Sequence, residues 1–307
     1  MRTLPGLGHD ALGVDITPSP FTQVVGSIAD RATVDRCMPG IDAVLHTATL
    51  HKPHVATHPR QAFVDTNITG TLNLLEAAVA HRVRAFVFTS TTSTFGDALT
   101  PPRGEPAAWI TEDVVPIPKN IYGATKTAAE DLLKLFHRNE GLPCLVLRTS
   151  RFFPEGDDVV EQRNAFADAN LKVNELLYRR VDTEDVVSAL LLAIERAPAL
   201  GFERFIITAT TPFTRADLAE LGRDAPAVVA RHFPDVPAIY SRLGWRMLPV
   251  LDRVYVNERA RRLLGWQPKY DFASALARVA AGLDYRSPVA TAVGAKGYHP
   301  PGVAKPG

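Results

Sequence analysis

The chain has few cysteines and no cysteine motif. Only Cys37 and Cys144 occur among its 307 residues, and no C-x-x-C spacing is present. Two such distant cysteines argue against a disulfide framework and fit a reducing compartment better. We therefore expect a cytoplasmic protein.

Excess charge and long apolar runs are also missing. The 34 Lys and Arg residues nearly balance 33 Asp and Glu residues, which gives a formal net charge of +1. This balance provides no electrostatic basis for binding nucleic acid or an anionic membrane. No apolar run reaches the roughly 18 residues of a membrane span, and "MRTLPGLGHD" lacks the pattern of a signal peptide. The expected partner is therefore a small-molecule substrate, with no nucleic acid and no membrane.

What the sequence does contain is an alternation of short apolar segments with longer helical patterns. The short segments are almost continuously hydrophobic, which is typical of parallel strands covered on both faces. We expect strands over 11–16, 22–27, 42–48, 84–90, 144–150 and 204–209, and helices over 58–81, 121–141 and 182–197. The pattern predicts an α/β fold, a Rossmann-like doubly wound parallel sheet with a small, mostly helical C-terminal lobe.

The segment "NIYGATKTAAED" (120–131) places Tyr122 and Lys126 four residues apart, on one face of a predicted helix. A nearby ammonium favours the phenolate and lowers the pKa of a tyrosine, as general base catalysis requires. A Y-x-x-x-K spacing alone is more often an ordinary surface feature. Its context favours chemistry, because the hydroxyl-rich "FVFTSTTSTFGD" (86–97) ends a predicted strand at the carboxyl edge of the sheet, where doubly wound folds bind ligands. The alternative is that these Ser and Thr residues only cap turns.

Several segments, in order, resemble the extended short-chain dehydrogenases/reductases of the NAD-dependent epimerase/dehydratase group, with a pattern similar to that of nucleotide-sugar 4-epimerases. The resemblance extends from about residue 8 to residue 283. It rests on "GHDALGVDI", "GSIAD", "VLHTAT", "DTNITGTLNLLEAA", "FTSTTSTFGD", "NIYGATK", "RRVDTEDVVSALLLAIE" and "LGWQPKYDFASAL".

The resemblance implies a domain organisation. Residues 1–150 would form a dinucleotide-binding domain, completed by about 180–210. A small substrate lobe would comprise about 151–180 and 211–290, and the Gly- and Pro-rich stretch 291–307 would be a loose tail.

The resemblance also implies catalytic roles. Tyr122 would be the general base or acid, Lys126 would lower its pKa and hold the nicotinamide ribose, and Thr91 would orient the substrate hydroxyl. Thr92 and Arg151 are candidates for substrate contacts. Arg151 could bind a phosphate or carboxylate, or form only a surface ion pair.

A cofactor site is implied in the same way. Asp15 would accept hydrogen bonds from the adenosine ribose, and no arginine follows it in "DITPSP", so NAD is favoured over NADP. A strand-end acid in a turn is the alternative for Asp15. The remaining expected cofactor-binding residues are Ser27, Ile28, Thr47, Ala48, Thr49 and Asn67, together with Tyr122 and Lys126.

The sequence departs from the family pattern at its beginning. The family's first strand and glycine-rich turn, whose backbone approaches a pyrophosphate, are missing before Asp15. Either the true start lies upstream, which we favour, or the chain is a shortened relative with a weakened phosphate site. Three further departures are Phe95, where a tyrosine is usual, Arg151, where 4-epimerases often carry an asparagine, and the short segment between 158 and 179, which argues against a UDP-sugar substrate.

Four histidines cluster in "HTATLHKPHVATH" (46–58), at His46, His51, His54 and His58. Their spacing matches no familiar zinc pattern, so we expect no metal site and interpret them as part of a loop beside the nicotinamide pocket.

The leading hypothesis is an NAD-dependent oxidoreductase or epimerase that acts on a secondary alcohol of a sugar or sugar nucleotide through Thr91, Tyr122 and Lys126. The alternatives are a simple NAD(P)-dependent dehydrogenase or reductase of a small hydroxy or keto substrate, and a non-catalytic dinucleotide-binding paralogue. A homodimer is expected from the resemblance.

Overall fold

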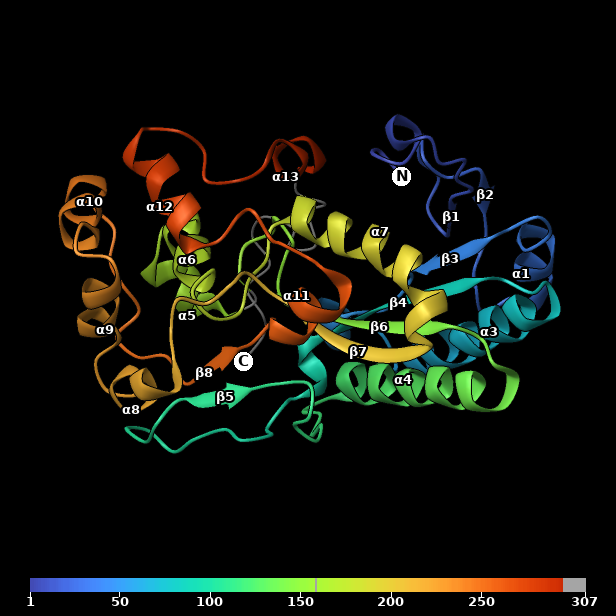
Figure 1. The fold of residues 1–307 in the computed structure, drawn as a ribbon, viewed down its shortest axis with the longest axis horizontal. Coiled ribbons are helices and arrows are strands. Elements are labelled where there is room, and N and C mark those ends of the chain that lie inside the picture. Colours follow the sequence, from blue (N-terminus) through green and yellow to red (C-terminus); the bar gives the residue numbers. More distant parts are fainter. Residues whose placement is uncertain (158, 295–307) are drawn as a thin grey trace. The chain divides into compact units, whose positions relative to one another are not determined.

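The computed structural model describes residues 1–157 and 159–294, and its chain forms two compact units (Figure 1). Each unit is assembled from three separate stretches of the chain. The first unit comprises Met1–Gly96, Pro116–Leu147 and Ala193–Arg204; the second comprises Asp97–Val115, Arg148–Leu192 and the chain from Phe205 on.

The main sheet has four strands in the order β3-β4-β6-β7. They are β3 (Ala43–His46), β4 (Ala85–Thr91), β6 (Cys144–Thr149) and β7 (Phe202–Ile207). β3 and β4 are parallel, and His46 is paired with Phe88. Every residue of β6 and nearly every residue of β4 is buried, as expected for a strand covered on both faces. The predicted α/β, Rossmann-like fold is therefore confirmed.

A separate two-stranded parallel sheet precedes the main one. It contains β1 (Val14–Asp15) and β2 (Val24–Val25), which are shorter than the strands predicted there. Among the described residues, the only strand paired with β3 is β4.

The helices of the first unit pack on this sheet through apolar side chains such as Leu75, Leu133 and Val146. They are α1 (Arg31–Cys37), α2 (Arg60–Val64), α3 (Gly70–Ala80) and α4 (Ile121–Glu140), with short 3-10 turns η1 (Pro5–Leu7), η2 (Lys52–Ala56) and η4 (Thr92–Thr94). The helix expected over 58–81 is interrupted by a π-helical segment, η3 (Asp65–Thr69). α4 ends where predicted, because Gly141 adopts φ +71° at its C-cap.

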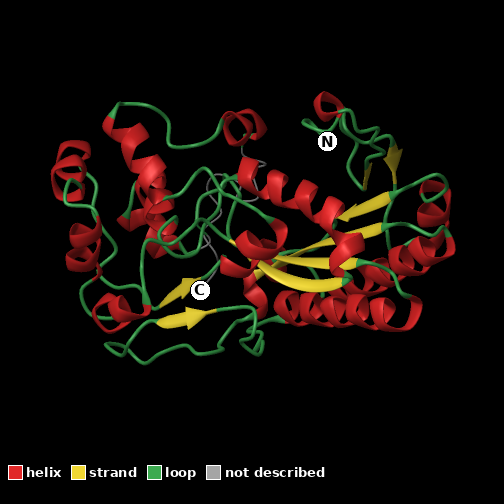
Figure 2. Cartoon of the chain, in the orientation of Figure 1, coloured by secondary structure: helices red, strands yellow, loops and turns green. Residues whose placement is uncertain are grey.

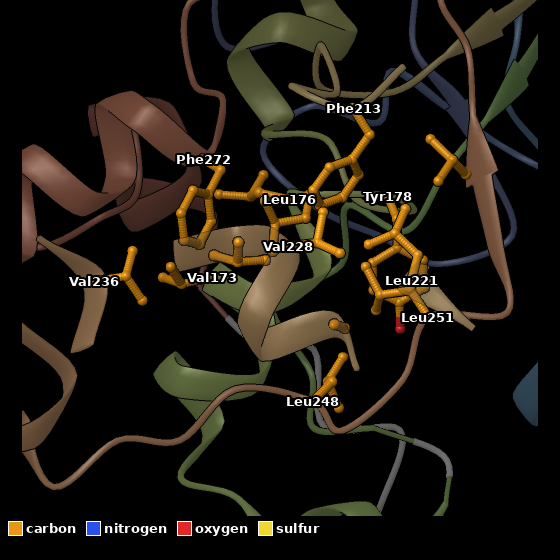
Figure 3. Close-up of a cluster of buried hydrophobic side chains, with 14 of the residues drawn as sticks. Val173, Leu176, Tyr178, Phe213, Leu221, Val228, Val236, Leu248, Leu251 and Phe272 are labelled. Atoms are coloured by element: carbon orange, nitrogen blue, oxygen red, sulfur yellow. The ribbon is translucent and has the colours of Figure 1, made fainter. Parts of the chain in front are cut away.

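In the second unit, helices joined by long loops predominate over strands, as Figure 2 shows. Its elements are β5 (Ala108–Ile110), α5 (Val160–Ala165), α6 (Asp168–Glu175), η5 (Arg215–Asp217), α8 (Leu218–Leu221), α9 (Ala225–His232), α10 (Val236–Leu243), β8 (Arg253–Tyr255), α11 (Glu258–Leu264), α12 (Phe272–Ala280) and α13 (Pro288–Val293). Helix α7 (Thr183–Leu200) contributes to both units. Figure 3 shows the core of the second unit, in which Val173, Leu176, Phe213 and Phe272 pack together.

Some elements of the second unit differ from the sequence expectation. β5 and β8 form a small parallel pair that the sequence did not predict, because three-residue strands carry too little periodicity to be recognised. α13 covers the start of the stretch expected to be a loose tail, and residues 295–307 of that stretch lie outside the described residues. No helix in the described parts of the chain is both long and apolar enough for a bilayer span.

Candidate functional site

The first unit brings the carboxyl end of β4 close to the start of α4. Thr91 ends β4 and caps η4, where its Oγ1 accepts a hydrogen bond from the Ser93 amide at 3.1 Å. The chain then turns at Gly96, whose φ of +53° disfavours a side chain and whose Cβ would lie 2.0 Å from the Ile117 carbonyl oxygen. This crowding means that only glycine fits at residue 96.

A second glycine allows the helix to approach the same turn. Asn120 caps α4 by accepting a hydrogen bond from the Gly123 amide at 3.1 Å. A Cβ on Gly123 would lie 2.8 Å from the carbonyl oxygen of Ser93, so the first turn of α4 packs directly on η4. The residue before Gly123 is Tyr122, which is thereby placed beside Thr91.

Tyr122 and Thr91 are both buried, each with 8% of its surface exposed. Burial raises the pKa of Tyr122 to about 12, and the hydrogen bond with the Thr91 hydroxyl opposes this rise. The expected lowering of the pKa of Tyr122 by Lys126 stays a prediction, because only burial and the Thr91 hydroxyl act on the phenol here. Desolvation dominates, and the Thr91 hydroxyl, not the ammonium, is the group that favours the phenolate.

Lys126 is 1% exposed, and its Nζ lies 3.7 Å from the centroid of the Phe88 ring. Burial lowers the pKa of Lys126 to about 7, although the carboxylate of Glu130 opposes the change. Among the described residues, no hydrogen-bond acceptor or ion-pair partner binds this ammonium. A cation–π contact alone leaves its N–H donors available to the hydroxyl groups of a ligand.

Glu130 is a site residue that the sequence reasoning missed. It is fully buried, accepts a hydrogen bond from Ser90 Oγ at 2.6 Å, and is paired with Arg204 Nε at 3.1 Å. The sequence contained a signal for Glu130. Together with Tyr122 and Lys126 it follows the spacing i, i+4 and i+8, which places the three side chains on one face of α4.

His46 lies beside Phe88, the aromatic ring that Lys126 contacts. It is buried on β3 with its ring centroid 5.0 Å from that of Phe88, and its Nε2 lies 2.8 Å from Thr71 Oγ1. Because the Thr71 hydroxyl donates to the Asn67 carbonyl oxygen, His46 must donate through Nε2 and keep Nδ1 as an acceptor. Burial and, secondarily, Lys126 lower the pKa of His46 well below its usual value, so the imidazole is neutral.

Asn67 joins three elements. From the π-helical segment η3, its Nδ2 donates to the Leu50 carbonyl and to Thr125 Oγ1, both at 3.0 Å. Its Oδ1 accepts from the Leu50 amide at 2.9 Å and from Thr49 Oγ1 at 3.0 Å. Its amide group therefore fixes the loop after β3 against α4, and this is the contact that the structure shows for it.

The remaining candidate cofactor residues follow the strands of the first unit. Asp15 is exposed at the end of β1 and accepts a hydrogen bond from the Thr17 amide at 2.9 Å. Ser27 and Ile28 follow β2, and the carbonyl of Ile28 is held by Asn73 Nδ2 at 3.0 Å. Thr47, Ala48 and Thr49 follow β3 and are exposed or half-buried. All of these candidate cofactor residues belong to the first unit.

The proposed substrate residues are divided between the units. Thr92 is half-buried in η4 of the first unit. Arg151 follows β6 in the second unit, where its Nη1 is paired with Asp157 and with Glu175. Arg151 therefore forms ion pairs with two buried carboxylates instead of a surface pair, and 29% of its own side chain remains exposed.

The histidines after β3 form a row. His51 and His54 have ring centroids 4.6 Å apart, and those of His54 and His58 lie 4.9 Å apart. Within residues 1–157 and 159–294, no group of three or more His, Cys, Asp or Glu side chains is arranged to hold a metal ion.

Comparisons with known proteins give one consistent picture. The model of the NAD dependent epimerase/dehydratase family matches residues 1–206. A dTDP-glucose 4,6-dehydratase of Streptomyces antibioticus is 31% identical over 279 residues, which cover 84% of this chain and 74% of that protein. A UDP-glucose 4-epimerase of Rhizobium meliloti is 30% identical over 276 residues, which cover 81% of this chain and 80% of that protein.

A solved structure gives the same fold. A short-chain dehydrogenase/reductase superfamily protein from Agrobacterium tumefaciens, with bound NAD, superimposes with a TM-score of 0.62 at 24% identity, covering 91% of each chain.

Proposed function

The chain belongs to the NAD dependent epimerase/dehydratase family, and from this premise we propose that it oxidises a secondary alcohol of a sugar or sugar nucleotide through Thr91, Tyr122 and Lys126. The observation that carries the proposal is the buried pair of hydroxyl groups on Thr91 and Tyr122, with the donors of Lys126 available one helical turn along α4. The family relation and the NAD-bound structural neighbour support NAD as the cofactor.

The roles of Tyr122 and Thr91 in proton transfer follow from the protonation state of the Tyr122 phenol. The pKa of Tyr122 is raised to about 12, so the phenol is protonated at neutral pH and can give its proton to a forming alkoxide when a ketone is reduced. In the oxidation direction Tyr122 must start as the phenolate, which takes the proton of the alcohol and becomes the phenol. The Thr91 hydroxyl favours the phenolate required for this step, because it donates a hydrogen bond to it.

Lys126 and the strand ends would bind the cofactor. Lys126 Nζ would donate to a ribose hydroxyl, Asp15 would accept from the adenosine ribose, and Ser27, Ile28 and the loop 47–49 would line the remaining dinucleotide. Bound NAD would supply the acceptor for the hydride that leaves the same carbon. Burial of Thr91 and Tyr122 keeps bulk water from competing for the proton.

The test is a turnover assay with NAD and two sugar nucleotides, UDP-glucose and dTDP-glucose. An epimerase returns the hydride, so we expect conversion of the sugar without net NADH. Absence of turnover with both sugars, in a folded protein that binds NAD, would contradict a sugar-nucleotide substrate.

A second candidate is a dehydrogenase of a small hydroxy acid. It is favoured by the short segment between residues 158 and 179, which leaves little chain to bind a nucleotide. Stoichiometric formation of NADH from a uronic acid distinguishes this activity from epimerisation.

A further inference from the structure

The second unit contains a groove that the proposed function does not use. The groove has a volume of about 500 Å³ and is lined by β5, by the chain that follows β7 and by the segment 256–262, which includes most of α11. All three segments belong to the second unit. Sites for small molecules have volumes of roughly 300–1,000 Å³, so the groove is large enough for such a ligand.

The base of the groove is apolar. Phe213 and Val256 line it and are 4% and 8% exposed, and Phe213 belongs to the core shown in Figure 3. Trp109 of β5 also lines the groove and is half-buried, so it offers aromatic surface to a ligand. The guanidinium carbon of Arg215 lies 5.4 Å from the centroid of the Trp109 ring. A planar ring of a ligand can pack against such a surface.

Hydrogen bonds hold the three walls of the groove together. Asn257 Nδ2 donates to the Thr208 carbonyl at 2.9 Å and to Thr210 Oγ1 at 3.0 Å, which joins the start of α11 to the chain after β7. The Val256 amide donates to the Ile110 carbonyl at 3.0 Å, which joins the same segment to β5. The shape of the groove is therefore determined before any ligand binds.

The rim of the groove carries an excess of positive charge. Arg261 and Arg262 line the groove from α11, and both are exposed. In the parts of the chain that the structure describes, neither guanidinium group has a hydrogen-bond acceptor or an ion-pair partner. Among the described residues that line the groove, Glu258 has the only carboxylate, and it forms no ion pair with either arginine. Two cations and one anion leave the groove positive, so it favours an anionic ligand.

We propose that this groove binds an aromatic oxyanion, a small molecule in which a planar ring carries a carboxylate or a phosphate group. The ring packs against Trp109 on the apolar base. The oxyanion accepts hydrogen bonds from Arg261 and Arg262, because a guanidinium group presents parallel N–H donors that match a carboxylate or a phosphate. A neutral ring or an inorganic anion makes only part of these contacts. The site consists of residues of the second unit alone, so its test does not depend on the proposed function.

Calorimetry of the full chain with benzoate and with phenyl phosphate tests the class of ligand, because the two probes share a ring and differ in the oxyanion. We expect one of them to bind with a Kd on the order of 1 mM, as suits a ligand with so few atoms. Benzamide has the ring without the charge, inorganic phosphate has the charge without the ring, and both should bind at least about fivefold more weakly. No binding of benzoate or phenyl phosphate would overturn the proposal, as would equally tight binding of benzamide or inorganic phosphate.

Substitution of the rim arginines tests where the oxyanion binds. Arg261→Gln and Arg262→Gln each remove one exposed, unpaired charge, so neither variant should disturb folding. We expect each variant to bind the preferred anion about threefold or more weakly than the parent does. Arg103→Gln is the matched control, because Arg103 is exposed in the same unit and does not line the groove, and it should bind as the parent does. Equal affinity in the parent and in both rim variants would overturn the proposal.

Tryptophan fluorescence tests where the ring binds. The chain has three tryptophans, and of these only Trp109 lines the groove. We expect the preferred anion to change the fluorescence of the parent and of Trp245→Phe, which removes another half-buried tryptophan of the same unit. Trp109→Phe keeps an aromatic ring in the groove, but the change in fluorescence should be lost. A change that persists in Trp109→Phe would show that the ligand lies elsewhere in the protein and would contradict the proposal.

Discussion

At the scale of single residues, the candidate site contains Tyr122 and Lys126, and burial disfavours the charged form of each side chain. Tyr122 is kept protonated by burial, and Lys126 is placed over an aromatic ring instead of beside a carboxylate oxygen. Such an arrangement costs stability, and it is retained where donors must stay available to a ligand. Removal of the buried Lys126 ammonium should therefore increase the free energy of unfolding.

Lys126→Met should stabilise the protein. The pKa of Lys126 is lowered to about 7 when folded and is higher in the unfolded chain, so the native state carries the full penalty below about pH 7 and loses it as pH rises toward the unfolded value. We expect a gain of roughly 2 kcal/mol or more near pH 6. Urea denaturation at pH 6 and at pH 10 should show the gain shrinking with pH. A gain that is the same at both values would contradict the depressed pKa.

The sequence allowed part of this residue-level description. Tyr122, Lys126 and Thr91 were identifiable because helix spacing and strand-end position are local properties. The contact of Lys126 with Phe88, and that of Phe88 with His46, depends on which strand pairs with which helix and in what register. The rise in the pKa of Tyr122 caused by burial likewise depends on the packed structure.

At the scale of elements, two glycines determine how closely α4 approaches the carboxyl end of β4. Gly96 and Gly123 remove the side chains that would separate η4 from the first turn of α4. The helix and its end at Gly141 were predictable from sequence, since amphipathic spacing and the C′ glycine are strong signals. The π-helical segment that carries Asn67 was not, because it is formed by tertiary contacts with Leu50 and Thr125.

Gly123→Ala should separate α4 from η4. Its Cβ would approach the Ser93 carbonyl to 2.8 Å, so the helix must shift, at a cost of about 1–3 kcal/mol. Because the shift moves Tyr122 from Thr91, we expect turnover to fall about tenfold or more. Ala124→Gly, one residue on, is a control for backbone flexibility in the same turn. Full turnover in Gly123→Ala would show that the close approach is not required.

At the scale of the whole molecule, the two units differ in architecture, because the first contains most of the main sheet and the second consists mainly of short helices and loops. The strand ends of the first unit carry the proposed dinucleotide site. The alternation of strands and helices was sufficient to predict the α/β class. It was insufficient for the second unit, whose short helices and three-residue strands are specified by burial in the core of Figure 3.

The choice of cofactor should be visible in thermal stability. A ligand that binds only the native state raises the melting temperature, so we expect NAD to stabilise the chain more than NADP does, because the exposed carboxylate of Asp15 repels a 2′-phosphate. Asp15→Asn should reduce the difference between the melting temperatures measured with NAD and with NADP. Equal stabilisation of the parent by NAD and NADP would contradict the proposal that Asp15 binds the adenosine ribose.

The central claim is that the phenolic hydroxyl of Tyr122 transfers the proton. The most direct measurement is kcat of Tyr122→Phe with NAD and the substrate that the parent converts, beside Tyr240→Phe, which removes a buried hydroxyl from α10 of the second unit. We predict that kcat falls by about 10²-fold or more in Tyr122→Phe and changes little in Tyr240→Phe. A Tyr122→Phe enzyme as fast as the parent would contradict the account.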